Sequence, residues 1–265
     1  MSTVALRQFG VFFDKYYWKT AVMIAQNGLG RMYRNSFFGM LWTVFQPLTM
    51  VVVYSTIMPL IMRAPTSDYT LFIIVSIPVW NFFSACIIGS GSSILSNGET
   101  LKRCIVSSSV FPIADVLRNT YTFFVSFMTM YVASILFGFG KFSLTMFLIP
   151  VYFIPVLVTI CSMAVALAFI SPYIRDVGEI AAISMTVLFW FTPVVYPVTM
   201  LSPKTQFLMQ FNPFYVMIHP IQELGHEHIL PSFTETWHLL ALAALSVAVG
   251  FSVFRICRRN YVYYL

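Results

Sequence analysis

Long apolar runs separated by short polar segments account for most of this chain, and they limit its fold more than any other feature. Of its 265 residues, 59% are hydrophobic and only 9% are charged, whereas about 25% of the residues in ordinary soluble domains are charged. So few charges cannot cover a soluble surface. Because about 20 consecutive apolar residues form a helix that spans a bilayer, the pattern predicts an all-α, polytopic membrane protein.

Six of the runs have the length and the flanking residues of transmembrane helices. They cover residues 37–61, 69–88, 112–138, 145–170, 180–198 and 237–256. Glycines, serines and charges fill the breaks between them, as in GSGSSILSN at residues 89–97 and SPYIRDVGE at 171–179. We therefore interpret residues 1–265 as a single transmembrane domain. Within it, Asp115 and Arg118 lie three residues apart on one helical face and are predicted to pair.

Residues 4–30 are amphipathic rather than uniformly apolar. One helical face carries Leu6, Phe9, Phe13, Tyr17, Thr20 and Ile24. Lys15 and Lys19 fall on the opposite face, so this segment is predicted to lie on the membrane surface with its lysines at anionic headgroups. Glycines at 28 and 30 permit a break there, which places Arg31 and Arg34 at the phosphate level where the first span begins. The alternative is a seventh span, although the apolar part of this segment alone is too short to cross.

The segment at residues 204–225 is apolar but interrupted. Its run from Phe207 to Ile221 is too short to span and contains Pro213 and Pro220. Broken backbone at membrane depth is tolerated only where protein or a water-filled cavity covers it. We therefore expect short re-entrant or interfacial helices here, on the outer side of the membrane.

The basic residues predict the orientation of the chain. Of the 15 lysines and arginines, all but Arg63, Lys141 and Lys204 fall on one side of the six-span arrangement. Cytoplasmic loops carry an excess of lysine and arginine, so both termini and the loops around Glu99 and Arg175 are predicted to face the cytoplasm. The net charge of +6 then reflects contact with lipid headgroups rather than binding of nucleic acid.

Motifs that carry chemistry are missing from the sequence. It contains no phosphate-binding G-x-x-x-x-G-K-[ST] loop, no G-x-S-x-G elbow and no H-E-x-x-H pair. We therefore predict no catalytic residue, no enzyme activity and no ATP hydrolysis by this chain alone. His226, Glu227 and His228, with His219 and Glu223 nearby, offer metal-binding groups, but nothing in the sequence supplies a clear fourth ligand, and no metal site is predicted.

Three motifs in order give the chain a resemblance to a known family. The stretch RMYRNSFFGMLWTVFQPL at residues 31–48 resembles the first-span motif of the membrane subunits of bacterial polysaccharide ABC exporters, the O-antigen and capsule permeases of the type-2 ABC export family. The matching positions are Arg34, Ser36, Gly39, Trp42, Pro47 and Leu48, whereas Phe38 replaces the usual leucine and Gln46 the usual asparagine. YIRDV at residues 173–177, followed by FWFTPVVYP at 189–197, and FNPF at 211–214 are similar to later motifs of that family.

The resemblance implies a homodimer of this chain that works with two copies of a separate ABC ATPase subunit. ATP and Mg²⁺ would be bound by the ATPase, and this chain would bind no cofactor. Glu99, Lys102 and Arg103 are then candidates for a coupling helix that contacts the ATPase, although a solvated loop of charges fits the same residues. In that family the interrupted segment forms an outer gate, which here would include Phe207, Phe211, Phe214 and Tyr215.

The implied substrate is a lipid-linked polysaccharide, O-antigen or capsule, exported across the bacterial inner membrane. Sugar rings contact aromatic side chains through their C–H faces, and their hydroxyls need hydrogen-bonding partners. Candidates to line the path are therefore aromatic residues around the first and fifth spans: Tyr33, Phe37, Trp42, Phe45, Phe189, Trp190 and Tyr196. Simple packing remains open for each of them. Two other functions also remain open: an ABC exporter of a small hydrophobic drug or lipid, and a membrane-embedded transferase, which lacks a suitable pair of reactive groups.

Overall fold

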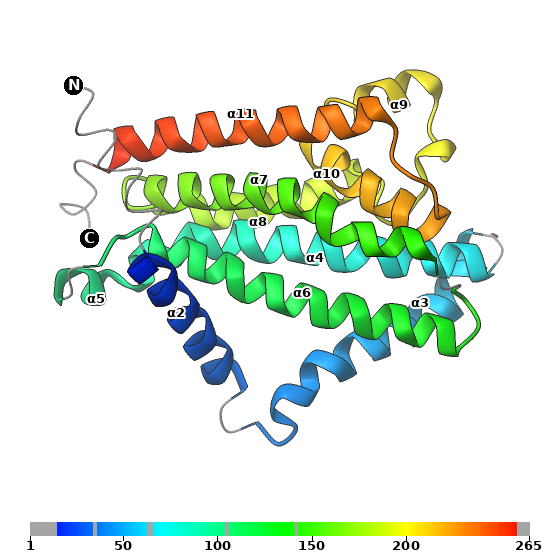
Figure 1. The fold of residues 1–265 in the computed structure, drawn as a ribbon, viewed down its shortest axis with the longest axis horizontal. Helices are drawn as coiled ribbons and strands as arrows, with labels where there is room; N and C mark the ends of the chain where they lie inside the picture. The colour runs from blue at the N-terminus through cyan, green and yellow to red at the C-terminus, as the bar shows by residue number, and fades with distance from the viewer. Residues whose placement is uncertain (1–14, 34–35, 63–65, 104–105, 141–142, 259–265) are drawn as a thin grey trace.

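The computed structural model describes residues 15–33, 36–62, 66–103, 106–140 and 143–258. Within these ranges the chain is helical and contains no strand, as predicted. The long helices lie side by side along the long axis of the molecule, with α4 in the middle of the bundle (Figure 1). The helices are α2 (Lys15–Tyr33), α3 (Trp42–Met62), α4 (Thr66–Ser96), α5 (Gly98–Arg103), α6 (Val110–Leu136), α7 (Ile149–Ile170), α8 (Val177–Phe191), α9 (Pro203–Met209), α10 (Pro213–Gln222) and α11 (Phe233–Cys257).

In the described residues, four short helical turns of 3-10 or π geometry lie between these helices. Three are 3-10 turns, η1 (Gly39–Leu41), η2 (Leu144–Leu148) and η3 (Val198–Met200). The fourth, η4 (Glu223–Glu227), is a π-helical turn that continues α10. It ends at His228, whose φ of 59° is left-handed.

Helix α4 forms the centre of the core because it is apolar on every side. Ile73, Val75, Val79 and Phe83 on this helix are fully buried, as expected for a helix that is covered all round. Stacked aromatic rings from the neighbouring helices fill the space beside it. The Phe123 ring of α6 and the Phe153 ring of α7 are parallel within 2°, with centroids 4.5 Å apart.

Among the helices of the described residues, three have both the length and the apolar composition needed to cross a membrane. Their apolar parts are Tyr69–Ser96 in α4, Leu144–Ile170 in η2 and α7, and Phe233–Cys257 in α11. Shorter apolar helices are found at Trp42–Ile57 and Val177–Phe191. The helix limits follow the predicted runs in most places, and the exceptions have physical reasons.

The largest difference is the predicted break at residues 89–97, which is wrong. Helix α4 continues to Ser96. The serines there satisfy their hydroxyls within the helix, since Ser90 Oγ donates to the Ile87 carbonyl at 2.8 Å and Ser93 Oγ to the Ser90 carbonyl at 3.1 Å. Gly91 marks a close contact with α8 rather than a break, because a Cβ there would lie 2.7 Å from the Gly178 Cα.

Other boundaries also shift. Helix α8 ends at Phe191 and not at 198, because Pro193 cannot continue the helical hydrogen bonding. Helix α3 begins at Trp42 rather than at Phe37, after the η1 turn in which Gly39 has a φ of +50°. Helix α2 runs through both glycines to Tyr33, so the break expected at Gly28 and Gly30 is wrong as well.

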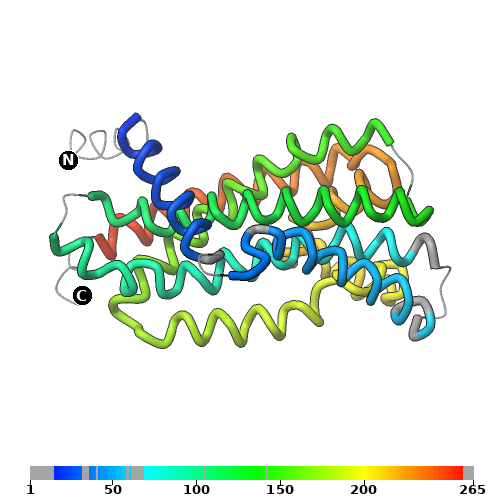
Figure 2. The backbone as a smooth tube through the Cα atoms, turned by 90° about the horizontal axis from the view of Figure 1, so that it is seen from below, coloured from blue at the N-terminus to red at the C-terminus, as the bar shows by residue number. Residues whose placement is uncertain are grey.

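Helix α2 crosses the bundle obliquely and converges with the start of α3 away from the other helices (Figures 1 and 2). Its inner face contacts α6, where the buried Tyr17 hydroxyl donates to Ser109 Oγ at 3.0 Å. Lys15 and Lys19 are exposed on its outer face. That this helix lies on the membrane surface stays a prediction. Residues 4–14 of the predicted amphipathic segment lie outside the described residues.

Candidate functional site

A cavity of about 470 Å³ lies between α3, α4, α6 and α8. Its walls combine uncharged polar side chains with aromatic rings, and none of its lining residues is charged. The lining residues are Thr43, Gln46, Pro47, Met50 and Tyr54 of α3, Ile77, Asn81, Phe82 and Ala85 of α4, Asn119, Thr122, Phe123, Ser126 and Met130 of α6, and Phe189 of α8.

Helix α6 places three polar side chains on the cavity wall. Asn119, Thr122 and Ser126 follow the i, i+3, i+7 spacing of one helical face. Thr122 Oγ1 donates to the Arg118 carbonyl at 3.2 Å, whereas the Asn119 amide is buried and has a weak contact with the Cys86 thiol. A thiol is a weak hydrogen-bonding partner, so this amide at the cavity wall remains suited to a ligand or water that enters the cavity.

An ion pair lies next to this polar face. Arg118 Nη1 is 3.0 Å from Asp115 Oδ1, which confirms the predicted pair. Both side chains are partly exposed. The pair is therefore a local contact along α6, and neither residue lines the cavity.

The predicted path residues divide into one that lines the cavity and several that do not. Phe189 lines it and packs against Trp80 with ring centroids 5.6 Å apart. Phe37, Trp42, Phe45 and Trp190 are instead exposed on the surface of the single chain. The Tyr196 hydroxyl donates to the Trp190 carbonyl at 2.9 Å, outside the cavity lining. The side chain of Tyr33 is outside the described residues.

The exposed aromatics at the start of α3 form one cluster. The Phe38 ring makes edge-to-face contacts with Phe37, Trp42 and Phe45, at centroid distances of 4.9, 5.5 and 5.5 Å. Such a cluster on the surface is available to lipid or to another protein chain. Arg31 at the end of α2 is exposed nearby in sequence, and its Nε donates to the Asn27 carbonyl at 3.4 Å. Arg34 lies outside the described residues.

The predicted coupling residues form the short helix α5 at one end of the bundle (Figure 1). Glu99 and Arg103 pair across one turn at 3.0 Å, with both side chains more than three-quarters exposed. Lys102 is exposed beside them. Leu101 is half-buried against the core, so an apolar contact holds the helix while its charges face outward.

The predicted gate segment consists of α9, α10 and η4 at the opposite end of the bundle from α5 (Figure 1). Phe214 is buried, and its ring centroid lies 5.6 Å from that of Trp80. Phe207 and Phe211 pair on the surface at 5.5 Å, and Tyr215 lies against His219 with ring centroids 4.8 Å apart. Their role as a gate stays a prediction.

Two of the sequence motifs have structural roles that explain their residue types. In FNPF, Asn212 caps α10 by accepting from the Phe214 and Tyr215 amides at 3.0 and 3.4 Å, and Pro213 occupies the first helical position. In YIRDV, the Tyr173 hydroxyl donates to the Cys257 carbonyl at 2.7 Å and so joins the turn before α8 to the end of α11.

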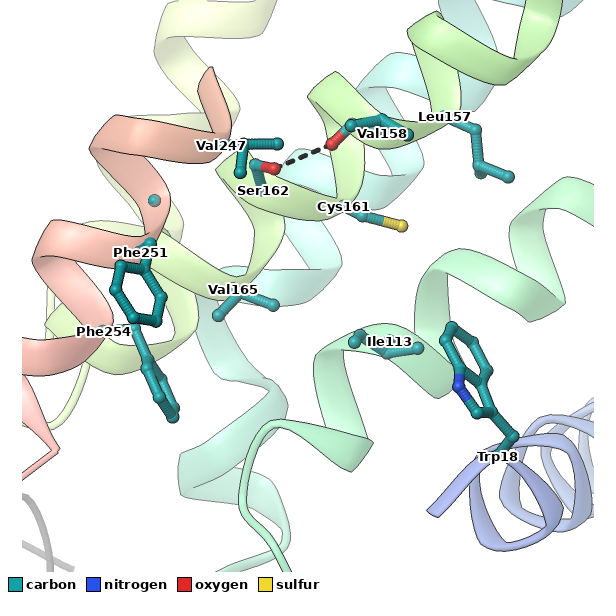
Figure 3. A pocket seen from close by; sticks show the side chains of 11 residues that line it. Trp18, Ile113, Leu157, Val158, Cys161, Ser162, Val165, Val247, Phe251 and Phe254 are labelled. Carbon is teal, nitrogen blue, oxygen red and sulfur yellow. Dashed lines mark hydrogen bonds between the residues drawn. The ribbon is translucent and has the colours of Figure 1, made fainter. Parts of the chain in front are cut away.

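A second pocket, of about 400 Å³, lies between α2, α6, α7 and α11 and is almost wholly apolar (Figure 3). Trp18 lies on one side of it, and Phe251 and Phe254 lie on the other. The Ser162 hydroxyl is satisfied by the Val158 carbonyl at 2.8 Å and offers little to a ligand. A pocket of this chemistry suits a hydrocarbon chain.

Sequence reasoning missed the polar residues of the cavity. The signal was present, because Asn119, Thr122 and Ser126 share one face of an otherwise apolar helix, and polar groups inside a membrane helix are expected to face a cavity or another helix. The positions of Asn81 of α4 and Gln46 of α3 in the cavity wall could not be predicted from the sequence, because they depend on how the helices pack.

The sequence matches the ABC-2 type transporter family over residues 20–224, well over half of the chain. The chain belongs to the ABC-2 type transporter family. As an ABC-2 transporter permease, it is a multi-pass membrane protein, in agreement with its apolar helices. The match covers α3 to α10 and therefore includes every helix that lines the polar cavity.

Relatives of this ABC-2 permease have names that refer to one substrate class. It is 28% identical over 230 residues to the O-antigen export system permease protein RfbA of Myxococcus xanthus, an alignment that covers 86% of this chain and 87% of the relative. It is 24% identical over 215 residues to the protein of the same name from Klebsiella pneumoniae, with 81% and 83% covered. The similarity therefore extends over most of both chains.

Proposed function

We propose that this permease forms the membrane path of an ATP-driven exporter of a lipid-linked polysaccharide, O-antigen or capsule, across the bacterial inner membrane. It acts as a homodimer with two copies of an ABC ATPase subunit, which bind ATP and Mg²⁺, while this chain binds no nucleotide. Helices α3, α4, α6, α7, α8 and α11 are its six spans. The names of the relatives support the substrate class.

The observation that carries the proposal is the chemistry of the cavity between α3, α4, α6 and α8. Amides and hydroxyls such as those of Asn81, Asn119 and Ser126 match sugar hydroxyls, while Phe82 and Phe189 match the apolar faces of sugar rings. The absence of charge among the lining residues lets a neutral or varied glycan pass without strong binding. This mixture suits a conduit for carbohydrate better than a site for an ion.

The exposed aromatic side chains just before and on α3, and on α8, support the homodimer. Phe37 and Trp190 are 95% and 65% exposed in the single chain, and large apolar side chains of this kind are enriched where protein chains meet. Two copies related by a two-fold axis would place the same helices against each other. The polar cavity of each copy would then open toward a shared path.

The positions of the helix ends support an orientation with both termini in the cytoplasm. The start of α2, the end of α11 and the short helix α5 lie at the same end of the molecule (Figure 1). The exposed cations Lys15, Lys19, Lys102, Arg103 and Arg258 belong to these elements or follow them directly. Such a concentration fits the cytoplasmic side of a membrane, and α5 is then placed to contact the ATPase.

The test is transport by the purified complex of this permease with its ATPase subunit in proteoliposomes that contain a lipid-linked glycan. We expect ATP to make the glycan accessible to an impermeant glycan-binding probe on the opposite face, and the isolated permease to hydrolyse no ATP. Glycan that stays on its original face, with a stable and ATP-hydrolysing complex, would contradict the proposal.

The second candidate is export of a small hydrophobic drug or lipid, which the apolar pocket between α2, α7 and α11 favours. Under the first proposal, the same pocket holds the lipid chain of the glycan donor or a bilayer lipid. The proteoliposome experiment separates the two. ATP-dependent movement of a glycan-free lipid, without movement of the lipid-linked glycan, would support the second candidate.

A further inference from the structure

Three metal-binding side chains meet at the end of the bundle that holds α10. His219 of α10, Glu223 at the start of η4 and Glu235 in the first turn of α11 each offer a ligand atom, and these atoms all lie within 4.8 Å of one another. His219 Nδ1 lies 3.5 Å from Glu235 Oε1 and 3.7 Å from Glu223 Oε2. Sequence spacing shows only the first two as neighbours, one helical turn apart, because Glu235 comes from another helix.

These distances are too long for hydrogen bonds but suit ligands of one ion. An N–H···O bond is about 2.7–3.2 Å long. In a tetrahedral zinc site, ligands about 2.0–2.2 Å from the metal are ~3.4 Å from each other. The observed separations of 3.5 and 3.7 Å are close to that value.

Burial adds an independent indication of a missing partner. Glu223 is only 7% exposed, and no hydrogen-bond donor reaches its Oε2 atom; Nδ1 of His219 is likewise buried without a hydrogen-bond partner. Within the described residues, the ion pairs of Glu223 and Glu235 are with His219 and with no lysine or arginine.

Glu235 is held in position by its own helix end. Its Oε2 accepts from the Ser232 amide at 2.7 Å and from Ser232 Oγ at 2.6 Å, in a reciprocal capping box. Oε1 is thereby left directed toward His219. Outer contacts that fix a ligand in this way are common around protein metal sites.

A polar cavity of about 340 Å³ gives access to the cluster. Its lining includes His219 and Glu235, together with Gln210, Tyr215 and His238. Glu223 is not part of the lining, so it lies on the buried side of the cluster, away from the cavity. An ion held by three side chains would have its remaining position available to water or to a ligand in this cavity.

We propose that His219, Glu223 and Glu235 form a binding site for one divalent transition-metal ion of the zinc type. Imidazole combined with carboxylates fits Zn²⁺ better than Mg²⁺, which prefers oxygen ligands and keeps its waters. The bound ion joins α10 and η4 to the start of α11 and so braces the segment between α8 and α11. This site does not depend on the identity of the exported substrate.

The experiment is titration of the purified full-length permease, freed of metal with a chelator, with Zn²⁺ against a competing chromogenic chelator. We expect one tight Zn²⁺ per chain and no binding of Mg²⁺ at the same concentration. His219→Gln, Glu223→Gln and Glu235→Gln should each weaken zinc binding by at least the roughly 10- to 100-fold that loss of an outer contact causes. X-ray absorption of the zinc-loaded protein should show one nitrogen ligand and otherwise oxygen.

Two matched controls keep the test specific. His238→Gln removes an imidazole that lines the same cavity but lies outside the cluster. The double variant His226→Gln/His228→Gln removes the two histidines at the end of η4. Both should keep the affinity of the unaltered permease within about threefold. Thermal unfolding with and without Zn²⁺ gives a second readout, since binding to the folded state raises its stability.

Several outcomes would overturn the proposal. The first is that the permease does not bind Zn²⁺ tightly. The second is that folded variants of the three ligands bind Zn²⁺ as well as the unaltered permease. The third is that the His226→Gln/His228→Gln variant loses as much affinity as Glu235→Gln. Because no substrate or ATPase is present in this experiment, its result is independent of the proposed transport function.

Discussion

At the scale of single residues, buried polar side chains join segments that are distant in the sequence. Gln222 is almost fully buried, and its Nε2 donates to Ser76 Oγ at 2.8 Å and to the Pro193 carbonyl at 2.9 Å. It thereby links the end of α10 to α4 and to the turn after α8. The Pro193 carbonyl lies beyond the end of α8, outside the helical hydrogen bonds, so the side-chain amide of Gln222 supplies its donor.

We expect Gln222→Leu to lower the free energy of unfolding by about 1–3 kcal/mol, because the Pro193 carbonyl is left buried without a donor. Reversible unfolding of the purified permease in mixed micelles measures this loss. Gln210→Leu, at an exposed position, should change it by less than about 0.5 kcal/mol. Equal effects of the two changes would show that the buried contact contributes nothing.

A change at Asn119 separates transport from folding. Leucine has the same branched shape, and the Asn119 amide has only a weak contact with the Cys86 thiol, so Asn119→Leu should change the free energy of unfolding by less than about 1 kcal/mol. Loss of one hydrogen bond to the passing glycan should lower the export rate by about fivefold, which corresponds to ~1 kcal/mol. Export is measured in the proteoliposome assay.

The control for this prediction is Thr120→Val. Thr120 is the next residue of α6, its hydroxyl is satisfied by the Val116 carbonyl at 2.8 Å, and it does not line the cavity. Export by this variant should match that of the unaltered permease. If Asn119→Leu also exports at the full rate, the cavity is not the path.

At the scale of helices, small residues decide how closely α4 and α8 approach. A Cβ at Gly91 would lie 2.7 Å from the Gly178 Cα, a backbone atom that cannot move aside easily. A Cβ at Gly178, by contrast, would not crowd α4, since it would meet no atom closer than 3.9 Å. Gly91 therefore sets the distance between the two helices.

We expect Gly91→Ala to destabilise the permease by about 1–3 kcal/mol through overpacking. Gly178→Ala should be tolerated. Gly89 is on the same helix as Gly91, but a Cβ at Gly89 would meet no atom within 4 Å, so Gly89→Ala should be neutral or stabilising by up to about 1 kcal/mol. The same unfolding measurement compares all three. A similar effect at Gly89 and Gly91 would rule out the close contact as the cause.

Helix α5 gives the prediction for coupling. Reversal of its two exposed cations in Lys102→Glu/Arg103→Glu should uncouple ATP hydrolysis from export, because these side chains face outward from a helix that Leu101 anchors to the core. We expect export to fall by about tenfold, the effect of ~1.4 kcal/mol, while the permease stays folded. The control is Lys204→Glu on α9, at the other end of the bundle. Unchanged export by a stable complex would contradict the coupling role.

Much of the helical arrangement could be predicted from hydrophobic runs, but the helix limits near 89–97 could not. Glycine and serine are typical of loops when only neighbours in the sequence are considered. In the folded chain, Gly91 serves a contact with α8 and Ser90 bonds to its own helix, so tertiary packing overrides the local preference.

In the candidate sites too, some residues could be predicted from the sequence and others depend on tertiary packing. Asn119, Thr122 and Ser126 share a face that the sequence alone could have revealed, and His219 and Glu223 are spaced as neighbours on a helix. Glu235 and Asn81 join these groups only because separate helices pack together. Phe189, predicted to line the path, does line the cavity, whereas Trp190, one residue later, is exposed on the surface. Their roles in transport stay predictions.

At the scale of the whole molecule, the permease has two distinct ends. One end carries α5, the start of α2 and the end of α11, and the other carries α9, α10 and the His219 cluster (Figures 1 and 2). The polar cavity opens between these ends, beside the exposed helices α3 and α8. The proposed function requires contact with the ATPase at the end that carries α5 and release of substrate at the other end.

Photo-crosslinking tests most directly whether the glycan passes through the cavity. A photoreactive amino acid replaces Ser126 in the cavity wall or, as the control, Val151 on the exposed face of α7. In cells that make the lipid-linked glycan and the ATPase subunit, we expect light to attach glycan to the permease at position 126 and not at position 151. Equal labelling at both positions, or no glycan at position 126 in a permease that still exports, would contradict the account.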